Sequence, residues 1–230
     1  MIVIYQTVGL MTLNCNKENK LENMKVTKRD GSKEAVDLDK IHRVLEWAVE
    51  GLDNVSVSQI EMKSSIQLFD GMTTQDIHET LVKTAADLIS ETNPNYQYVA
   101  ARLAIFDIRK EAYGRFTPPS LYSHISGLTE KGLYDKHILE DYSKEQIEEV
   151  EKYIDHDRDL NFAYAAVQQL QGKYLVQNRV SKKVYESPQM LNMLVAMCLF
   201  SRYKENRLDY VIRFYDAVSE FRISLPTPIM

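Results

Sequence analysis

Apolar residues recur at helical spacing through most of this chain. The first run begins after Asp37, whose short side chain is of a type favoured at helix N-caps, and its apolar face comprises Leu38, Ile41, Val44, Leu45, Ala48 and Leu52. Directly before it, Val26 to Arg29 and Lys33 to Val36 flank the pair Asp30-Gly31. An Asp-Gly pair supplies the positive φ angles of a type I′ turn, so this segment predicts a β-hairpin that leads into a helix.

Three more helices are predicted before residue 115. Ser58 with Glu61, and Thr73 with Asp76, have the spacing of capping boxes, so each pair is expected to start a helix. The sequence Asn93-Pro94-Asn95 then ends the third helix and starts a fourth, which a glycine at position 114 is expected to end. A hairpin followed by four helices forms a compact unit of its own.

The second half of the chain is again mainly helical. Thr117-Pro118-Pro119 is the clearest interruption, and we place a domain boundary near it. Helices are predicted at Leu121 to Lys131, at Lys144 to Ile154, from Ser187-Pro188 to Leu199, and at Leu208 to Phe221. In the third of these helices, Cys198 is expected to be a small buried side chain.

Three shorter segments lie between and after these helices. The run His156-Asp157-Arg158-Asp159 is interpreted as a solvated, internally paired charge patch. Tyr174-Leu175-Val176 and Val184-Tyr185 predict a small strand pair. The closing segment, Ile223 to Met230, contains two prolines, which favour a first strand, an edge strand or an active-site loop over a central strand.

Composition narrows the class of protein. A chain of 230 residues with 44% apolar and 27% charged residues can bury one large or two small cores. A net charge of −5 argues against a broad nucleic-acid surface, and the apolar first fifteen residues are too short to span a membrane, so no nucleic acid or membrane partner is expected. Residues 1–24 are expected to be a disordered extension, with Met24 as an alternative start. Cys15 and Cys198 are the only cysteines, which favours a reducing, cytoplasmic setting.

A cluster of cations surrounds the predicted hairpin. Lys28, Arg29 and Lys40 are expected to converge near the N-terminus of the first helix, where the helix dipole already presents positive potential. These cations would repel one another unless an anion such as a polyphosphate were bound. The alternative is that they are solvated charges on a hairpin and a helix face.

Two further positions could contribute to the same pocket. Thr74 and His78 are four residues apart on the third helix, so they share one face, although a lone surface histidine is often inert. Lys110, late on the fourth helix, is a candidate phosphate donor. Its alternative role is to complement the C-terminal dipole of that helix.

Several separate segments together resemble a known family. The segments VTKRDGSKEAVDLDKIHRVLEWAVEGL, TTQDIHETLVKTAADLIS, YQYVAARLAIFDIRKEAYG and RFYDAVSEFRISLPTPIM are similar, in order and spacing, to the large (α) subunit of class Ia ribonucleoside-diphosphate reductase. The resemblance implies a mainly α fold: a β-hairpin and four-helix ATP-cone over residues 25–115, then a helical domain over 116–230. That domain would lead into the first strand of a ten-stranded α/β barrel, cut at its start.

The resemblance also implies a role for particular residues. Lys28 and Arg29 would hold phosphates of ATP or dATP together with Lys110, while Glu34, Asp37 and Lys40 would line the base end. Thr74 and His78 would lie by the sugar and phosphates, and Thr227 would belong to the diphosphate substrate site. Asp37 stands where such cones carry asparagine, so it could accept from the adenine amino group but not donate. Trp47, Arg43 and Phe106 could bear on a second nucleotide or be ordinary core and helix-face residues.

The catalytic part of the family's reaction is expected to lie elsewhere. The family reduces ribonucleoside diphosphates for DNA synthesis with a cysteine radical and two further cysteines, which lie beyond Met230, so this chain alone is expected to be inactive and to hold no redox cofactor. Implied partners are the remainder of the large subunit, a radical-generating small subunit, and thioredoxin or glutaredoxin. ATP or dATP, with Mg, would be the effector. Alternatives are a free-standing nucleotide sensor and a structural docking fragment.

Overall fold

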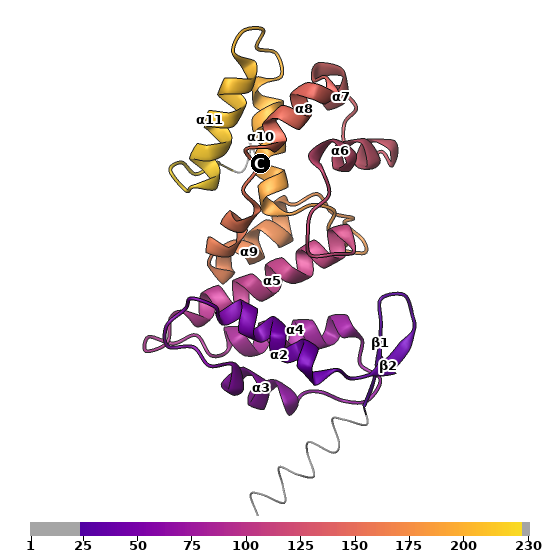
Figure 1. Cartoon of the computed structure of the whole chain (residues 1–230), viewed down its shortest axis with the longest axis vertical. Helices are drawn as coiled ribbons and strands as arrows, with labels where there is room; N and C mark the ends of the chain where they lie inside the picture. The colour runs from indigo at the N-terminus through magenta and orange to yellow at the C-terminus, as the bar shows by residue number, and fades with distance from the viewer. Residues whose placement is uncertain (1–23, 227–230) are drawn as a thin grey trace, which may run out of the picture. The chain divides into compact units, whose positions relative to one another are not determined.

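The structure, a computed structural model, describes residues 24–226, and these are mainly helical with one two-stranded hairpin. The chain divides into two compact units between Leu103 and Ala104, inside the helix α5 (Tyr96–Tyr113) (Figure 1). The predicted extension lies outside the described residues except for Met24, which is buried and accepts a hydrogen bond on its carbonyl from the Val36 N–H. Of the closing segment predicted as a strand or an active-site loop, residues 223–226 are described and form no strand, and Thr227 lies outside the described residues.

The predicted hairpin is confirmed. Strand β1 (Lys25–Thr27) pairs antiparallel with β2 (Lys33–Ala35), with Val26 opposite Glu34. Beyond the paired residues, the Lys28 N–H donates to the Ser32 carbonyl at 2.8 Å, so the loop between the arms has three residues. The pairing places alternate side chains of the two strands on one face.

The turn type was predicted wrongly. Gly31 has a φ of +84°, but Asp30 is absent from the non-glycine residues with positive φ in the described part of the chain. The loop is therefore a three-residue turn with one left-handed glycine rather than a type I′ turn, which needs two such residues. The Asp30 carboxylate accepts from the Ser32 N–H at 2.9 Å and its hydroxyl at 2.6 Å, and these bonds stabilise the alternative turn.

Four helices follow the hairpin, as predicted. They are α2 (Leu38–Val49), α3 (Val57–Ser65), α4 (Thr74–Ala86) and α5 (Tyr96–Tyr113). Thr73 and Asp76 form the predicted capping box of α4, and Gly114, with a φ of +69°, follows the end of α5. The capping box predicted at Ser58 is wrong: Ser56 caps α3 by accepting from the Gln59 N–H, because helix α3 starts two residues earlier.

The second unit is built from helical segments of different lengths. They are α6 (Leu121–Glu130), α7 (His137–Asp141), α8 (Lys144–Glu151), the 3₁₀ helix η1 (His156–Asn161), α9 (Tyr164–Gln169), the π-helical turn η2 (Leu170–Tyr174), α10 (Pro188–Phe200) and α11 (Arg207–Ser219). Pro188 occupies the first turn of α10, where its missing N–H has no helical partner to lose. The four longer helices predicted after the boundary are thus confirmed with shifted ends.

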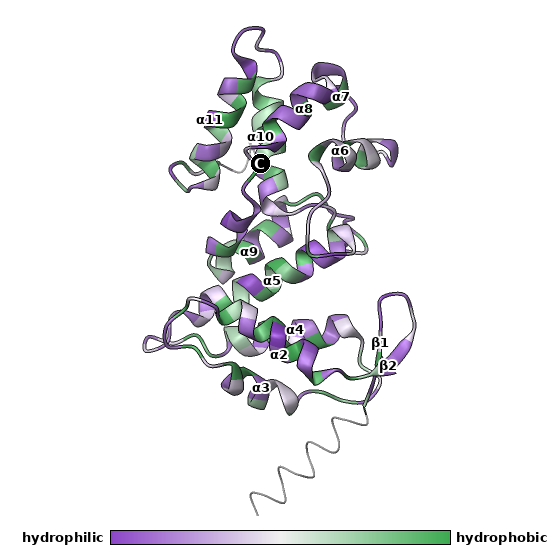
Figure 2. Ribbon diagram, in the orientation of Figure 1, coloured by the Kyte–Doolittle hydropathy of each residue, from purple (hydrophilic) through white to green (hydrophobic). Residues whose placement is uncertain are grey.

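Helix α10 forms the centre of the second unit. Its residues are apolar on nearly all sides, as the green ribbon shows (Figure 2), and most are buried. Around it lies one core that draws residues from α6, the end of α7, α8, α10 and α11: Leu121, Ile125, Tyr142, Ile147, Val150, Met190, Met193, Leu194, Ala196, Met197, Val211 and Tyr215. A helix that is hydrophobic all round is stable only inside such a core.

The charge patch predicted at His156 to Asp159 is wrong. Asp159 is fully buried and pairs with the buried Arg109 of α5, at 2.8 Å between Oδ2 and Nη2. Arg158 reaches across to α11, where its guanidinium contacts Asp216 at 2.9 Å and Glu220 at 3.1 Å. Arg158 and Asp159 therefore form tertiary ion pairs with neighbouring helices, while Asp157 is exposed.

The strand pair predicted near Val176 and Val184 is present only in reduced form. A single antiparallel bridge joins Gln177 to Val184, and the Tyr185 N–H donates to the Val176 carbonyl at 2.9 Å. Tyr174 belongs to the turn η2, so it cannot extend the pairing. None of the described helices is long and apolar enough to cross a bilayer.

Candidate functional site

The hairpin is joined to the start of α4 by backbone hydrogen bonds. The Thr27 N–H donates to the Met72 carbonyl at 2.9 Å, and Thr27 forms a parallel bridge with Thr73. One residue pair further back, the Gly71 N–H donates to the Lys25 carbonyl at 2.8 Å. Strand β1 is therefore bonded to β2 on one side and to the segment entering α4 on the other. Lys28, which follows Thr27, is brought to the N-terminal end of α4.

An apolar cluster beneath this junction also fixes the start of α2. Its buried members are Val26, Met72 and Ile77, and Val36, Ile41 and Leu68 pack against them. These side chains come from β1, the residue after β2, α2, the loop before α4, and α4 itself. The hairpin and the N-terminal ends of α2 and α4 are therefore held together as one site, which we call the cone junction.

Lys28 and Glu34, two predicted site residues, form an ion pair across the hairpin. The Lys28 Nζ and Glu34 Oε2 atoms are 2.5 Å apart, and both side chains are more than one-third exposed. The pairing follows from the register, because Lys28 lies opposite Ser32 and diagonally across from Glu34 on the same face. The hydrogen bond to Glu34 raises the pKa of Lys28.

Asp37 and Lys40 form a second such pair at the start of α2. Asp37 is the predicted N-cap and accepts from the Lys40 N–H at 3.0 Å, while its other oxygen lies 3.2 Å from the Lys40 Nζ. The hydrogen bond from the Lys40 backbone, then that from its side chain, lowers the pKa of Asp37. In this structure Lys28 and Lys40 are each balanced by a carboxylate of the same site, so these two lysines do not by themselves require a bound anion.

Thr74 and His78 share the N-terminal part of α4, as predicted. Thr74 is the first residue of the helix, directly after the N-cap Thr73. His78, one turn later, is half-buried, and its Nε2 lies 2.7 Å from the Leu103 carbonyl of α5. Since a carbonyl only accepts, Nε2 carries the hydrogen and Nδ1 is the acceptor of the neutral ring. The ring of His78 is thus held in place by α5, and its role in ligand binding stays a prediction.

The remaining predicted site residues are less closely tied to the junction. Arg29 is exposed in the hairpin loop, next to Lys28. Lys110 lies in the last turn of α5, in the second unit, with its Nζ 5.7 Å from the centre of the Phe106 ring. Its participation in phosphate binding stays a prediction, as does that of Thr227.

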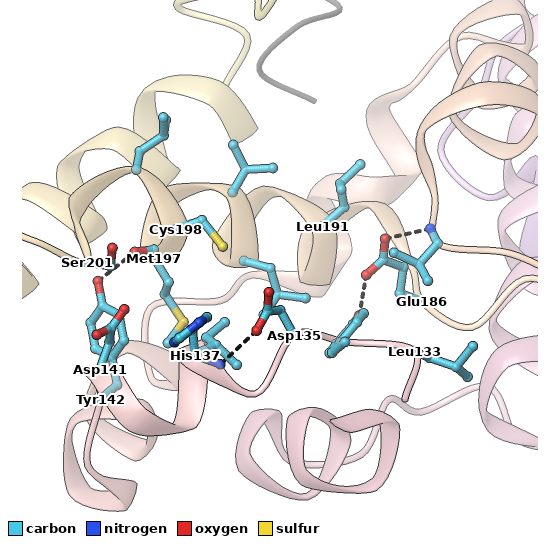
Figure 3. A pocket seen from close by; sticks show the side chains of 16 residues that line it. Leu133, Asp135, His137, Asp141, Tyr142, Glu186, Leu191, Met197, Cys198 and Ser201 are labelled. Carbon is cyan, nitrogen blue, oxygen red and sulfur yellow. Dashed lines mark hydrogen bonds between the residues drawn. The ribbon is translucent and has the colours of Figure 1, made fainter. Parts of the chain in front are cut away.

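The second unit contains a cavity that the sequence did not indicate. It has a volume of about 510 Å³ and lies between α10 and the segment that carries α7 (Figure 3). Cys198 lines it and is exposed, so the prediction of a buried cysteine is wrong. Partial burial of the thiol, followed by the charges of Asp135 and Asp141, raises the pKa of Cys198, which disfavours a reactive thiolate.

A buried carboxylate closes one end of this cavity. Glu186 accepts from the Val176 N–H at 2.8 Å and from the Tyr134 hydroxyl (Figure 3). The same hydroxyl lies 3.0 Å from His124 Nε2. Burial raises the pKa of Glu186 to about 7 and lowers that of His124 to about 4. A helical pattern alone could not reveal this network, because its members come from α6, a loop and the residue before Ser187.

No group of histidine, cysteine, aspartate or glutamate side chains in residues 24–226 has the arrangement of a metal site. The polar groups that the fold does bring together at the cone junction are cations, carboxylates, a hydroxyl and an imidazole. This set can bind a phosphorylated ligand with a hydrogen-bonding base or sugar.

Comparisons with known proteins agree with this arrangement. Residues 24–111 match the family described as ATP cone domain, and residues 160–230 match the family described as ribonucleotide reductase, all-alpha domain. The first match contains the whole cone junction together with Lys110. The second contains α9, α10 and α11.

Relatives with both parts are similar over most of this chain. The chain is 64% identical over 210 residues to ribonucleoside-diphosphate reductase 1 subunit alpha of Escherichia coli, 60% identical over 210 residues to the alpha subunit of Haemophilus influenzae, and 43% identical over 212 residues to that of Enterobacteria phage T4. Each match covers 91% of this chain and 28% of the relative, so the chain spans less than a third of their length. The chain therefore belongs to the family of ribonucleoside-diphosphate reductase alpha subunits and corresponds to their N-terminal part, with an ATP-cone.

Proposed function

We propose that the cone junction binds ATP or dATP as an allosteric effector. The observation that carries the proposal is the backbone bonding of Thr27 to Met72 and Thr73, which places Lys28 at the N-terminus of α4. Helix N-termini favour anions, and lysine or arginine side chains bind phosphates through charge-assisted hydrogen bonds. The ATP cone match over residues 24–111 supports a nucleotide as the anion.

Within this proposal each predicted residue has a role. Lys28 and Arg29 bind the phosphates, and Lys110 joins them from the end of α5. Thr74 and His78 lie by the sugar and phosphates, where the presence or absence of a ribose hydroxyl distinguishes ATP from dATP. Glu34, Asp37 and Lys40 line the base end. Mg²⁺ accompanies the nucleotide through its phosphates.

We further propose that this chain acts as the N-terminal part of a complete alpha subunit. The domains are the ATP-cone over residues 25–115 and the helical domain over 116–230, which precedes the catalytic barrel and contributes Thr227 to substrate binding. The complete enzyme reduces ribonucleoside diphosphates in the cytoplasm with a radical-generating small subunit and with thioredoxin or glutaredoxin. The cone regulates that activity, with ATP as activator and dATP as inhibitor.

Calorimetric titration tests nucleotide binding directly. The chain is expected to bind ATP and dATP saturably, and the double variant Lys28→Gln/Arg29→Gln is expected to bind both at least about 10-fold more weakly, because each hydrogen bond between charged groups contributes roughly 1.5–3 kcal/mol. The matched control, Lys63→Gln/Lys83→Gln, makes the same change in net charge at exposed positions of α3 and α4. Absence of binding by the unaltered chain would contradict the proposal and favour a docking role.

A further inference from the structure

Carboxylates of the cone junction already pair with two of its lysines, one of which, Lys28, is the proposed phosphate ligand. Lys28 is paired with Glu34 at 2.5 Å, and Lys40 is paired with Asp37 at 3.2 Å. A phosphate chain that binds Lys28 through a charge-assisted hydrogen bond has to replace Glu34 at the donor that it holds, or bind beside the charge of that carboxylate. Binding at this position is therefore a competition between two anions for one cation.

The Lys28–Glu34 pair is built into the hairpin. The two residues are six apart in sequence and share one face of the same two-stranded ladder, which the three-residue loop closes. Asp30 adds a second negative charge near Lys28, and together with Glu34 it contributes to the raised pKa of the lysine. The carboxylate is therefore a tethered competitor with a high local concentration, whereas the nucleotide competes from solution.

We propose that Glu34 sets the affinity of the cone for the triphosphate chain: it holds Lys28 and is displaced when the nucleotide binds. This inference rests on the proposed function of the site. Nucleotide binding is then an exchange of ion pairs, in which Lys28 passes from Glu34 to a phosphate oxygen. The exchange weakens binding relative to a site in which Lys28 has no carboxylate partner.

Glu34 is the carboxylate at which this effect can be isolated. Asp37 also caps α2 through the Lys40 N–H, so removing its charge would disturb the helix as well as the ion pair. In the described structure the side-chain contact of Glu34 is the pair with Lys28. The substitution Glu34→Gln therefore removes the competing charge and preserves the size of the side chain.

The test uses inorganic triphosphate as the probe, because it lacks the base and sugar that Glu34 is also proposed to approach. Glu34→Gln is expected to bind inorganic triphosphate about two- to fivefold more tightly than the unaltered chain, as measured by calorimetry at low ionic strength, since exposed ion pairs have effects of this size. The control Glu91→Gln removes one negative charge from an exposed position beyond the other end of α4 and is expected to change the affinity less.

A double-mutant cycle shows whether Glu34 acts through Lys28. In the Lys28→Gln background, adding Glu34→Gln is expected to produce no further gain in triphosphate affinity. Three outcomes would overturn the inference. They are no gain in triphosphate affinity in Glu34→Gln, an equal gain in Glu91→Gln, or a gain from Glu34→Gln that is equal with and without Lys28. Parallel titrations with dATP separate the two failures: a chain that binds dATP but shows no gain retains the proposed function, whereas one that binds no dATP loses both.

Discussion

Replacing Arg109 with methionine is expected to lower the free energy of unfolding of the second unit by about 3–5 kcal/mol. The guanidinium is 2% exposed, donates to Asp159 Oδ2 at 2.8 Å and to the His156 carbonyl, and stacks 4.8 Å from the centre of the Phe116 ring. Asp159 is fully buried, so the substitution leaves a carboxylate in the interior with no cation beside it. Urea denaturation followed by circular dichroism measures the loss.

Three comparisons separate the ion pair from general damage. Arg115→Met, at an exposed position just after α5, is expected to change stability by less than about 0.5 kcal/mol. Arg109→Met/Asp159→Asn is expected to recover part of the loss, because it removes the unpaired charge. Burial already raises the pKa of Asp159 to about 6 despite Arg109, so the loss in Arg109→Met should be smaller at pH 5 than at pH 8. A loss that is independent of pH and is not reduced in the double variant would contradict this account.

Replacing Glu186 with glutamine is expected to stabilise the second unit at neutral pH relative to the unaltered chain. Burial raises the pKa of Glu186 from 4.5 to about 7, against the opposing effect of the Tyr134 and Val176 hydrogen bonds. A difference of this size corresponds to about 3 kcal/mol between the two protonation states. Glutamine can still accept from the Val176 N–H and can donate to the Tyr134 hydroxyl oxygen, so the network can survive the change.

The sign of the pH dependence follows from which state binds the proton. Between pH 4.5 and about 7 the folded chain keeps the Glu186 proton while the unfolded chain has lost it, so this group lowers stability as the pH rises and has no further effect above 7. His124 and His156, whose pKa values burial lowers to about 4, act in the opposite sense between pH 4 and 6.5. In the unaltered chain the opposite effects of Glu186 and the two histidines therefore partly cancel, and the free energy of unfolding varies less with pH.

Subtracting the free energy of unfolding of the unaltered chain from that of Glu186→Gln cancels the contributions of the histidines. The free energy of unfolding of Glu186→Gln minus that of the unaltered chain is expected to rise by about 3 kcal/mol between pH 4.5 and pH 8, and to be constant above it. The control Glu130→Gln, at an exposed position at the end of α6, is expected to show no such rise. Parallel profiles for Glu186→Gln and the unaltered chain would show that Glu186 is ionised in the folded protein at pH 5–6.

The elements of the first unit were predictable where local chemistry decides them. Asp37 and Thr73 cap α2 and α4 as expected, because an N-cap depends on the side chain and the next three residues. The turn at Asp30-Gly31 and the cap of α3 were predicted wrongly. There, a bond from Ser32 to Asp30 and a serine two residues earlier in the chain provided local alternatives of similar energy.

The residues of the candidate site could be predicted from the sequence, but the ion pairs that they form with one another could not. The sequence indicated Lys28, Glu34, Asp37 and Lys40, yet the register that places Lys28 beside Glu34 depends on the turn, whose type was predicted wrongly. The burial of Asp159 could not be predicted either, because its partner Arg109 is 50 residues away in the chain. Long-range contacts of this kind have no local pattern.

The central claim is that an adenine nucleotide binds at the junction of the hairpin with α2 and α4. Backbone amide chemical-shift mapping of the isotope-labelled chain during a dATP titration tests it most directly. The account predicts the largest shifts at residues 27–37, in the first turn of α2, and at 73–78, with Lys110 as a further affected position. Shifts confined to other regions, such as the cavity lined by Tyr134, Glu186 and Cys198, would contradict it.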